Sequence, residues 1–279
     1  MNQILKKETL APNVVRCRIE APRIARKRQA GQFIILRAEP DGERIPLTIA
    51  NGDAEQGWIE IIFQVVGHGT THLAELRVGD EILDLVGPLG KPTHIEKFGH
   101  CLCVGGGVGI APLCPIVCAL REAGNEITTI LGARNAELLI LEDEMAAQSD
   151  ALFVATDDGS KGHKGFAADV FKQRLAEGEK FDFAVVIGPA IMMKVTTALT
   201  VAEGIQTVAS LNPIMVDGTG MCGGCRVTVH GQTRFACVDG PEFDAAGIDW
   251  DELVRRLASY RDAEHRMMDD HNCKLAGAK

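Results

Sequence analysis

The sequence predicts an antiparallel β-barrel, then an α/β domain with a doubly wound parallel sheet, then a glycine- and cysteine-rich loop and a helical tail. Residues 1–97 contain short stretches of alternating apolar and polar side chains, separated by turn-forming pairs. Over residues 98–205, buried-strand signals alternate with helical stretches, which is typical of a parallel sheet. The most tightly spaced cysteines lie in residues 206–240, ahead of the tail at 241–279.

The first part of the chain has the pattern of an all-β domain. The expected strands are Val14–Glu20, Gln32–Ala38, Trp58–Val66 and Glu81–Val86. The expected turns are Asp41-Gly42, Asn51-Gly52 and Gly79-Asp80. Several short strands at this spacing favour an antiparallel barrel or sandwich.

The second part alternates strands and helices. The expected strands are Cys101–Val104, Ile127–Gly132, Leu152–Thr156 and Phe183–Ile187. The expected helices are Pro112–Glu122, Leu138–Gln148 and Phe166–Ala176. Residues from Trp250 to His271 are charged and have a helical period, which predicts the tail helix.

Composition excludes several classes of protein. A chain of 279 residues accommodates about two domains. The net charge of -9 and the lack of a Lys and Arg stripe exclude a nucleic-acid footprint. The N-terminal MNQILKKETL has no apolar run, and the apolar stretch Cys101 to Cys118 is interrupted by Gly and Pro, so we expect no membrane segment and a cytoplasmic location. Nine scattered cysteines do not resemble a disulfide framework.

The sharpest motif is Asp217-Gly-Thr-Gly-Met-Cys222-Gly-Gly-Cys225, followed by Cys237. A plant-type 2Fe-2S loop has C-x4-C-x2-C spacing and a distant fourth Cys, and here Asp stands at the first position. We therefore predict a cluster held by the Asp217 carboxylate and the three thiolates. Structural zinc and a plain loop are the alternatives, and Asp217 could instead cap a turn.

A glycine-rich loop follows the first strand of the α/β domain and opens its first helix. Glycines there let the backbone approach a pyrophosphate, whose charge the helix N-terminus favours. The pair Gly188-Pro189 follows a later strand, at the edge where such a sheet faces a ligand, although it could be only a turn. The candidate nucleotide-binding residues of the loop are Gly105, Gly106, Gly107, Val108 and Gly109.

Two motifs in the first domain are suited to a phosphorylated ligand. An Arg beside a hydroxyl residue suits a phosphate or the edge of a flavin ring, and paired glycines suit backbone contact with a phosphate. Taken singly, each motif could be a surface ion pair or a hairpin turn. The candidate residues are Arg44, Pro46, Leu47 and Thr48 in the first motif, which we expect to end a strand, and Gly67, Gly69 and Thr70 in the second, which we expect to follow another strand.

These motifs in this order, with Gly87-Pro88-Leu89-Gly90 between them, resemble the ferredoxin-NADP reductase superfamily, and the likeness covers nearly the whole chain. The cluster loop narrows the resemblance to the branch of the dihydroorotate dehydrogenase electron-transfer subunit and the small subunit of NADH-dependent ferredoxin:NADP oxidoreductase. The stretch Asn212 to Cys222 looks like the second of these, whose members are similar in having Asp at the first ligand position. The dihydroorotate branch has Cys there.

The resemblance implies that the barrel binds FAD, with the isoalloxazine near Arg44 to Thr48 and the pyrophosphate near Gly67 to Thr70. Electrons would pass between NAD(H), FAD and a 2Fe-2S cluster, and no acid-base residue is then required. The implied partner is a larger flavin and iron-sulfur subunit in a heteromeric complex, with ferredoxin and electron bifurcation as open options. The alternatives are a subunit of a dihydroorotate- or sulfide-linked dehydrogenase and a zinc-stabilised module that binds nucleotide without turnover.

Asp157 and Asp158 end the third strand of the α/β domain, where the superfamily usually contacts the adenosine ribose. Two carboxylates would repel a 2'-phosphate and accept hydrogen bonds from a free 2'-hydroxyl, so the sequence favours NAD(H). Lys161 and Arg134 are close in sequence and would weaken this preference. The alternative is a solvated turn.

Overall fold

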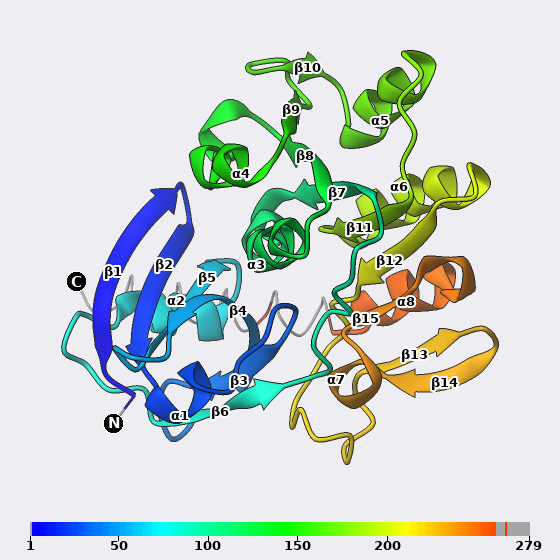
Figure 1. The fold of residues 1–279 in the computed structure, drawn as a ribbon. Helices are drawn as coiled ribbons and strands as arrows, with labels where there is room; N and C mark the ends of the chain where they lie inside the picture. Colours follow the sequence, from blue (N-terminus) through cyan, green and yellow to red (C-terminus); the bar gives the residue numbers. More distant parts are fainter. Residues whose placement is uncertain (1, 261–265, 267–279) are drawn as a thin grey trace.

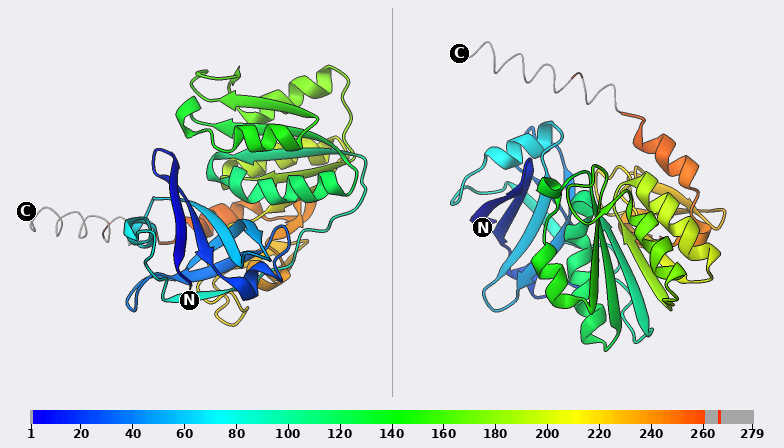
Figure 2. Two further views of the ribbon diagram at one scale, coloured as in Figure 1. Left: turned by 60° about the vertical axis from the view of Figure 1, so that its left-hand side comes forward. Right: turned by 90° about the horizontal axis from the view of Figure 1, so that it is seen from above.

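The computed structural model describes residues 2–260 and 266. Figure 1 shows an antiparallel barrel coloured blue to cyan beside a larger sheet coloured green to yellow, with a yellow to orange segment next to both. The two further views in Figure 2 show the same arrangement from the side and from above. The predicted fold class is confirmed in its barrel, its parallel-dominated α/β sheet and its cysteine-containing segment.

The barrel is a six-stranded antiparallel sheet in the order β1-β2-β5-β4-β3-β6. An isolated bridge between Gln3 and Glu81 joins the two edge strands, so the sheet closes on itself. Alternate residues of β2 and β5, such as Cys17, Ile19 and Ile61, are fully buried because one face of each strand points inward. The elements are β1 Ile4–Ala11, β2 Val14–Glu20, α1 Pro22–Ala25, β3 Phe33–Arg37, β4 Ile45–Asp53, β5 Trp58–Gln64, α2 His68–Glu75 and β6 Asp84–Leu89.

Two details of the barrel differ from the sequence-based expectation. The pair Asn51-Gly52 lies inside β4, and the turn comes later, at residues 54–57. The motif from Arg44 to Thr48 begins β4 instead of ending a strand. The turn is misplaced because the Asn-Gly pair is a strong turn signal, whereas here the pair is extended in β4, next to a register shift in the β4–β5 ladder.

The second sheet has seven strands in the order β10-β9-β8-β7-β11-β12-β15, and only β15 is antiparallel. Helices α3 and α4 pack on one face, and α5 and α6 pack on the other. The strands are β7 His100–Gly106, β8 Glu126–Ala133, β9 Ala151–Thr156, β10 His163–Lys164, β11 Phe183–Ile187, β12 Gln206–Ser210 and β15 Glu242–Asp244. The helices are α3 Ile110–Glu122, α4 Glu142–Gln148, α5 Ala167–Ala176 and α6 Ala190–Ala202. Strands β12 and β15 thus lie beyond residue 205, where the sequence places the end of this domain.

Two predicted helices are shorter than expected. The segment Leu138–Gln148 splits into a 3-10 turn at Ala136–Leu138 and α4, because Leu141 adopts a left-handed backbone with φ 56°. The tail forms α8 at Trp250–Leu257, and most of the remaining stretch to residue 271 lies outside the described residues. Within residues 2–260, no helix combines the length and apolar character needed to cross a membrane.

The barrel and the α/β sheet share one hydrophobic core. Val14 and Ile62 of the barrel pack with Ile110 and Leu113 of α3 in a single cluster of buried side chains. Across the same boundary, Arg16 Nη2 of β2 lies 2.9 Å from Glu144 Oε1 of α4. Burial of apolar side chains contributes most of the stability of such an interface. The interface therefore holds the carboxyl edge of the parallel sheet in place relative to the barrel.

The cysteine-containing segment forms the hairpin of β13 Arg226–Val229 and β14 Gln232–Phe235, then α7 Ala236–Asp239. Its buried residues Cys225, Cys237 and Val227 belong to one hydrophobic cluster with Phe33 and Ile35 of the barrel. The same cluster includes side chains of β7, β11 and α5. The segment is therefore packed between the barrel and the α/β domain.

Candidate functional site

A surface groove of about 240 Å³ lies where the barrel meets the cysteine-containing segment. It contains four residues predicted from the flavin motifs, and it adds three apolar side chains that directly precede the cluster loop in sequence. The lining residues are Glu43, Arg44, Ile45, Pro46, Val66, Gly67, Thr70, Pro213, Ile214 and Met215. Arg44 beside apolar walls suits a large planar ligand with phosphate groups, and the carboxylate of the lining, Glu43, accepts from Gly69 N.

The N-terminus of α2 opens onto this groove. Gly67 is the N-cap residue, and its N–H donates to Thr70 Oγ1 at 3.1 Å. No atom lies within 4 Å of the place where a Cβ of Gly67 would be, so the backbone is open on that side. The helix dipole favours a negative charge there, so the site fits the pyrophosphate of a bound flavin dinucleotide.

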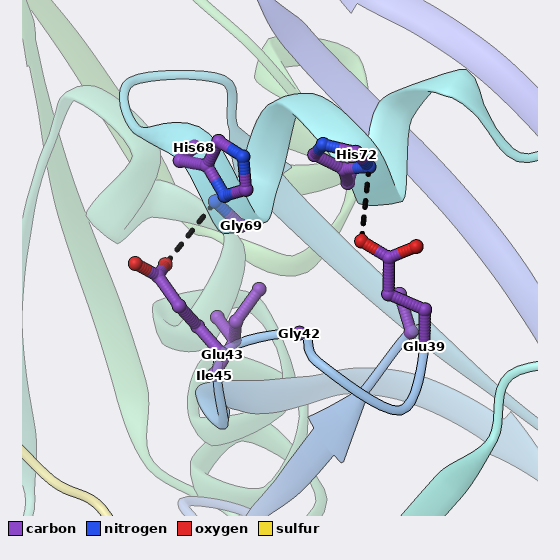
Figure 3. A pocket seen from close by; sticks show the side chains of 8 residues that line it. Glu39, Gly42, Glu43, Ile45, His68, Gly69 and His72 are labelled. Atoms are coloured by element: carbon purple, nitrogen blue, oxygen red, sulfur yellow. Dashed lines mark hydrogen bonds and ion pairs between the residues drawn. The ribbon is translucent and has the colours of Figure 1, made fainter. Parts of the chain in front are cut away.

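Gly69 faces a different neighbour. Its N–H donates to Glu43 Oε2 at 3.1 Å, and His72 Nδ1 of the same helix lies 3.2 Å from Glu39 Oε1 (Figure 3). These contacts fasten the loop before β4 onto α2 and enclose a cavity of about 10 Å³, which holds no more than one water molecule. Of the two spaces, only the open groove beside this cavity has room for a ligand of cofactor size.

The other two residues of the Arg44 motif continue along β4 and are not among those that line the groove. Leu47 pairs with Ile34, and Thr48 pairs with Phe33, in the β3–β4 ladder. Sequence reasoning missed the contribution of Pro213, Ile214 and Met215, which come from the far end of the chain. Only the position of Pro213 just before the cluster loop marked this stretch as unusual.

The glycine-rich loop and Gly188-Pro189 meet at the carboxyl edge of the parallel sheet. Strands β7 and β11 are neighbours, and the chain leaves β7 toward β8 on one side and returns through β11 on the other. This is the topological switch point, where open α/β sheets bind their ligands. A Cβ on Gly109 would lie 2.8 Å from the Gly188 Cα and the Ile187 O, so the two segments pack backbone against backbone.

Within this loop the five candidate residues have different surroundings. Gly105 and Gly106 end β7, and Gly107 begins a 3-10 turn that leads into α3. Gly107 has φ +55°, and the space that a Cβ would occupy there is open to 4 Å, so its backbone is accessible to a ligand at the sheet edge. Val108 packs against the core shared with the barrel. The loop therefore has both the conformation and the open face that a pyrophosphate needs.

The acidic pair follows β9, two strands from β7. Asp158 Oδ1 accepts hydrogen bonds from Ser160 N at 2.9 Å and Ser160 Oγ at 2.7 Å, and these bonds hold the pKa of Asp158 below its usual value. Asp157 is exposed. Lys161 Nζ lies 2.6 Å from Glu142 Oε2, so this cation is already paired with a carboxylate. That pairing reduces its attraction for a 2'-phosphate.

Asp217 caps the cluster loop through both carboxylate oxygens. Oδ1 accepts from Thr219 N at 2.9 Å and Oδ2 accepts from Cys222 N at 2.8 Å. The bond from Thr219 N, and then that from Cys222 N, lowers the pKa of the Asp217 carboxyl. The carboxylate is therefore ionised and next to the first cysteine, but its hydrogen bonds are those of a turn residue.

Two of the three cysteines lie close together. The Sγ atoms of Cys225 and Cys237 are 3.2 Å apart, whereas Cys222 is exposed, and in the described part of the chain no three possible ligands are arranged around one metal position. Two backbone N–H groups point at sulfur: Gly224 N lies 3.4 Å from Cys222 Sγ, and Cys237 N lies 3.5 Å from Cys225 Sγ. Thiolates with N–H groups turned toward them fit an iron-sulfur cluster. Burial raises the pKa of the Cys237 thiol to about 12, so metal binding must displace its proton.

Glu242, the first residue of β15, links the α/β sheet to the stretch that follows β6 of the barrel. Thr93 Oγ1 donates to Glu242 Oε1 at 2.6 Å, and both side chains lie against Gly31. Burial raises the pKa of Glu242 to about 7, with the Thr93 bond opposing this shift. Because the folded-state pKa exceeds the usual value, the protonated form stabilises the fold fully below about pH 4.5, and this stabilisation is lost as the pH rises through 7.

We expect Glu242→Gln to remove this pH dependence, since an amide keeps an acceptor for Thr93 but cannot ionise. Between about pH 5 and 8 the native protein should lose up to about 3 kcal/mol of stability that the variant keeps. Thermal unfolding midpoints across this range measure the difference, with Glu203→Gln, a change at an exposed carboxylate, as the control. Parallel pH profiles for Glu242→Gln and the native chain would contradict the expectation.

Three protein families match the chain in succession. Residues 2–94 match the oxidoreductase FAD-binding domain, and residues 103–198 match the oxidoreductase NAD-binding domain. Residues 212–249 match the iron-sulfur cluster binding domain of dihydroorotate dehydrogenase B. The predictions of FAD, NAD and a 2Fe-2S cluster are thereby confirmed at the level of domains.

Full-length relatives agree with these matches. A Thermotoga maritima protein, a homolog of the dihydroorotate dehydrogenase B (NAD(+)) electron transfer subunit, is 52% identical over 95% of this chain and 93% of its own length. The Desulforamulus reducens electron transfer subunit of that enzyme is 31% identical over 89% and 97%. A chain of the NADH-dependent reduced ferredoxin-NADP oxidoreductase structure, described in terms of flavin-based electron bifurcation, superposes with a TM-score of 0.93 at 47% identity, covering 97% of this chain and 98% of that one.

The resemblance drawn from the sequence motifs is therefore confirmed. The fold, the three matched domains and the full-length relatives give one consistent assignment. This chain belongs to the family of dihydroorotate dehydrogenase B electron transfer subunits, and it is an oxidoreductase subunit that binds FAD, NAD and a 2Fe-2S cluster.

Proposed function

We propose that this chain is the electron-transfer subunit of an NADH-dependent ferredoxin:NADP oxidoreductase complex, and that it passes electrons between NAD(H), FAD and its 2Fe-2S cluster. One observation carries the proposal. Met215 lines the candidate flavin groove and stands two residues before Asp217, so the flavin site and the cluster loop are adjacent. The 47% identical chain over nearly the full length comes from such a complex.

Bound FAD supplies the redox chemistry, because it accepts electrons in pairs and releases them one at a time. The residues of this chain bind and orient. Arg44 and the α2 N-terminus place positive charge along the groove, where they would hold the phosphate-bearing part of the cofactor. Met215 and Pro213 close the side nearest the cluster loop and exclude water there. Gly107 and Gly188 would hold the nicotinamide nucleotide at the carboxyl edge of the parallel sheet.

The surface of the cluster loop supports a partner subunit. Met221 is 89% exposed, and Val216 and Val238 are also exposed. Cys222, the residue after Met221, is exposed as well. Exposed apolar residues gathered around a redox centre are typical of a contact surface. We infer that a larger flavin and iron-sulfur subunit covers this loop in a cytoplasmic heteromeric complex and that ferredoxin exchanges electrons with that complex.

A second assignment is an electron-transfer subunit of a dihydroorotate-linked dehydrogenase. The family match of residues 212–249 favours it, because that family is defined on dihydroorotate dehydrogenase B. Asp217 at the first ligand position favours the ferredoxin:NADP complex instead. Identification of the subunit that co-purifies with the natively expressed chain, followed by assays with dihydroorotate and with ferredoxin plus NADP, separates the two assignments.

Anaerobic titration of the purified complex tests the function itself. NADH should bleach the flavin absorbance and reduce the cluster, and the isolated chain should reduce artificial acceptors but turn over poorly with a physiological acceptor. Full turnover of the lone chain with a natural acceptor would remove the need for a partner, and lack of any flavin would overturn the proposal.

The acidic pair should determine nucleotide choice. Asp157 and Asp158 place two negative charges at the edge where the adenosine ribose would lie, so NADH should reduce the flavin at least about tenfold faster than NADPH. Asn at both positions should narrow that ratio, as stopped-flow reduction would show. Glu126→Gln, at the opposite end of the same sheet, is the control and should leave the ratio unchanged. Equal rates with both nucleotides in the native protein would contradict the assignment.

A further inference from the structure

Two arginines from different elements bind the carbonyls of the two glycines in the Cys222-Gly-Gly-Cys225 loop. Arg256 Nη2 of α8 donates to Gly224 O at 3.0 Å, and Arg226 Nη1 donates to Gly223 O at 3.0 Å. Arg256 and Gly224 are 32 residues apart in sequence. Arg226 and Gly223 are only 3 residues apart. The cysteine spacing that marks the loop does not predict either of these arginine contacts.

One of these bonds, from Arg226, acts on a peptide whose N–H faces a sulfur, and the bond from Arg256 acts on the next peptide. Gly223 O belongs to the peptide whose N–H, on Gly224, lies 3.4 Å from Cys222 Sγ. Gly224 O belongs to the next peptide, whose N–H is that of Cys225, a predicted cluster ligand. A cation on the carbonyl end fixes the plane of a peptide and makes its N–H a stronger donor. Hydrogen bonds and positive charge near the sulfurs stabilise the reduced form of such clusters.

The position of Arg256 is set by the packing of α8. Leu253 of that helix is 2% exposed and belongs to the hydrophobic cluster that contains Cys225 and Cys237. Asp249 caps the helix by accepting from Glu252 N at 2.9 Å. Arg256 is a half-buried residue and its bond to the loop is partly buried, so solvent screens this bond less than it screens that of the exposed Arg226.

We propose that Arg256 is a positioning residue for the 2Fe-2S cluster: its guanidinium holds the Gly224–Cys225 peptide and raises the reduction potential of the cluster. The inference rests on the proposed function, since it requires a cluster in the loop. It assigns to the α8 helix a role in tuning the last redox centre of this subunit before the partner. The conservative replacement Lys keeps the charge but lacks the planar fork of Arg, so it should restore part of the effect.

The experiment uses the intact complex with Arg256→Gln, Arg256→Lys and Arg255→Gln. Arg255 lies in the same last turn of α8, is exposed and is placed toward Asp251, so its replacement removes an equal charge without touching the loop. We expect Arg256→Gln to move the cluster potential to a more negative value, to change its electron paramagnetic resonance signal and to speed iron loss to a chelator by about tenfold. The cluster potential and the rate of iron loss of Arg256→Lys should lie between those of Arg256→Gln and the native protein. Arg255→Gln should match the native protein in both.

The outcomes separate this inference from the function it depends on. If the native complex contains no 2Fe-2S signal, the proposed function fails before the variants are compared. If the native cluster is present and Arg256→Gln leaves its potential and resonance signal unchanged, the positioning role is overturned while the function stands. An equal shift in Arg255→Gln also overturns it, because the effect would then be one of net charge alone. If Arg256→Gln does not assemble, the potential of Arg256→Lys decides.

Discussion

Gly109→Ala is expected to abolish tight nicotinamide-nucleotide binding and to destabilise the α/β domain. A methyl group at this position would lie 2.8 Å from both Gly188 Cα and Ile187 O and 2.9 Å from Gly188 N. All three atoms are backbone atoms of the neighbouring strand and its loop, so they cannot rotate away as a side chain would. Separating the two segments should cost about 1–3 kcal/mol and widen the switch point at which the pyrophosphate would lie.

Gly132→Ala is the matched control for this change. Gly132 pairs with Gly106 at the same edge of the sheet, but a methyl group there meets its nearest neighbour, Ala167 Cβ, at 3.5 Å, an ordinary contact. The affinity for NAD(H), measured by titration calorimetry, should fall by at least about tenfold in Gly109→Ala and stay near the native value in Gly132→Ala. The unfolding midpoint should fall by roughly 3 °C per kcal/mol only in Gly109→Ala. Native affinity in Gly109→Ala would show that the close approach is unrelated to binding.

The sheets could be predicted because burial leaves a period in the sequence. The alternation in Val14–Glu20 gives β2 with the expected bounds, since one face of each barrel strand is buried. Continuous apolar runs give β7 and β11, which are buried on both faces. Helix α2 was missed because Gly67 and Gly69 suggest a turn, and Thr70, whose hydroxyl accepts the Gly67 N–H, is a weaker start signal than an acidic residue.

The sites could be predicted only where one segment supplies them. The spacing of Cys222 and Cys225 and the glycines after β7 are local, and each motif carries its own backbone requirement. The groove residue Met215 and the loop contact of Arg256 depend on tertiary packing, which brings together segments that are far apart in sequence. The approach of Cys237 to Cys225 was expected because a plant-type 2Fe-2S site needs a distant fourth ligand, and the β13–β14 hairpin, which pairs Arg226 with Phe235, brings the two cysteines together.

Cysteine and aspartate replacements in the cluster loop should have the largest effect on the redox centre. We expect Cys222→Ala, Cys225→Ala or Cys237→Ala to lose the cluster or most of its iron, because each removes a thiolate ligand. We expect Asp217→Cys to keep a 2Fe-2S cluster with altered optical and electron paramagnetic resonance signals and with a potential closer to the roughly -400 mV of all-Cys plant-type centres. A carboxylate oxygen is a harder donor than a thiolate, so the two ligands give chemically distinct centres.

The hydrogen bonds of Asp217 make Asp217→Asn the decisive variant. Asn keeps one oxygen that can accept from Thr219 N, but its NH2 group cannot accept from Cys222 N, and it loses the anionic donor that iron requires. If the carboxylate is a ligand, Asp217→Asn and Asp217→Ala should both lose iron, and Asp217→Cys should retain it. If Asp217 only caps the turn, Asp217→Asn should retain the iron and the optical spectrum of the 2Fe-2S cluster. The fourth ligand would then lie elsewhere, and Cys273, outside the described residues, would be the first to test.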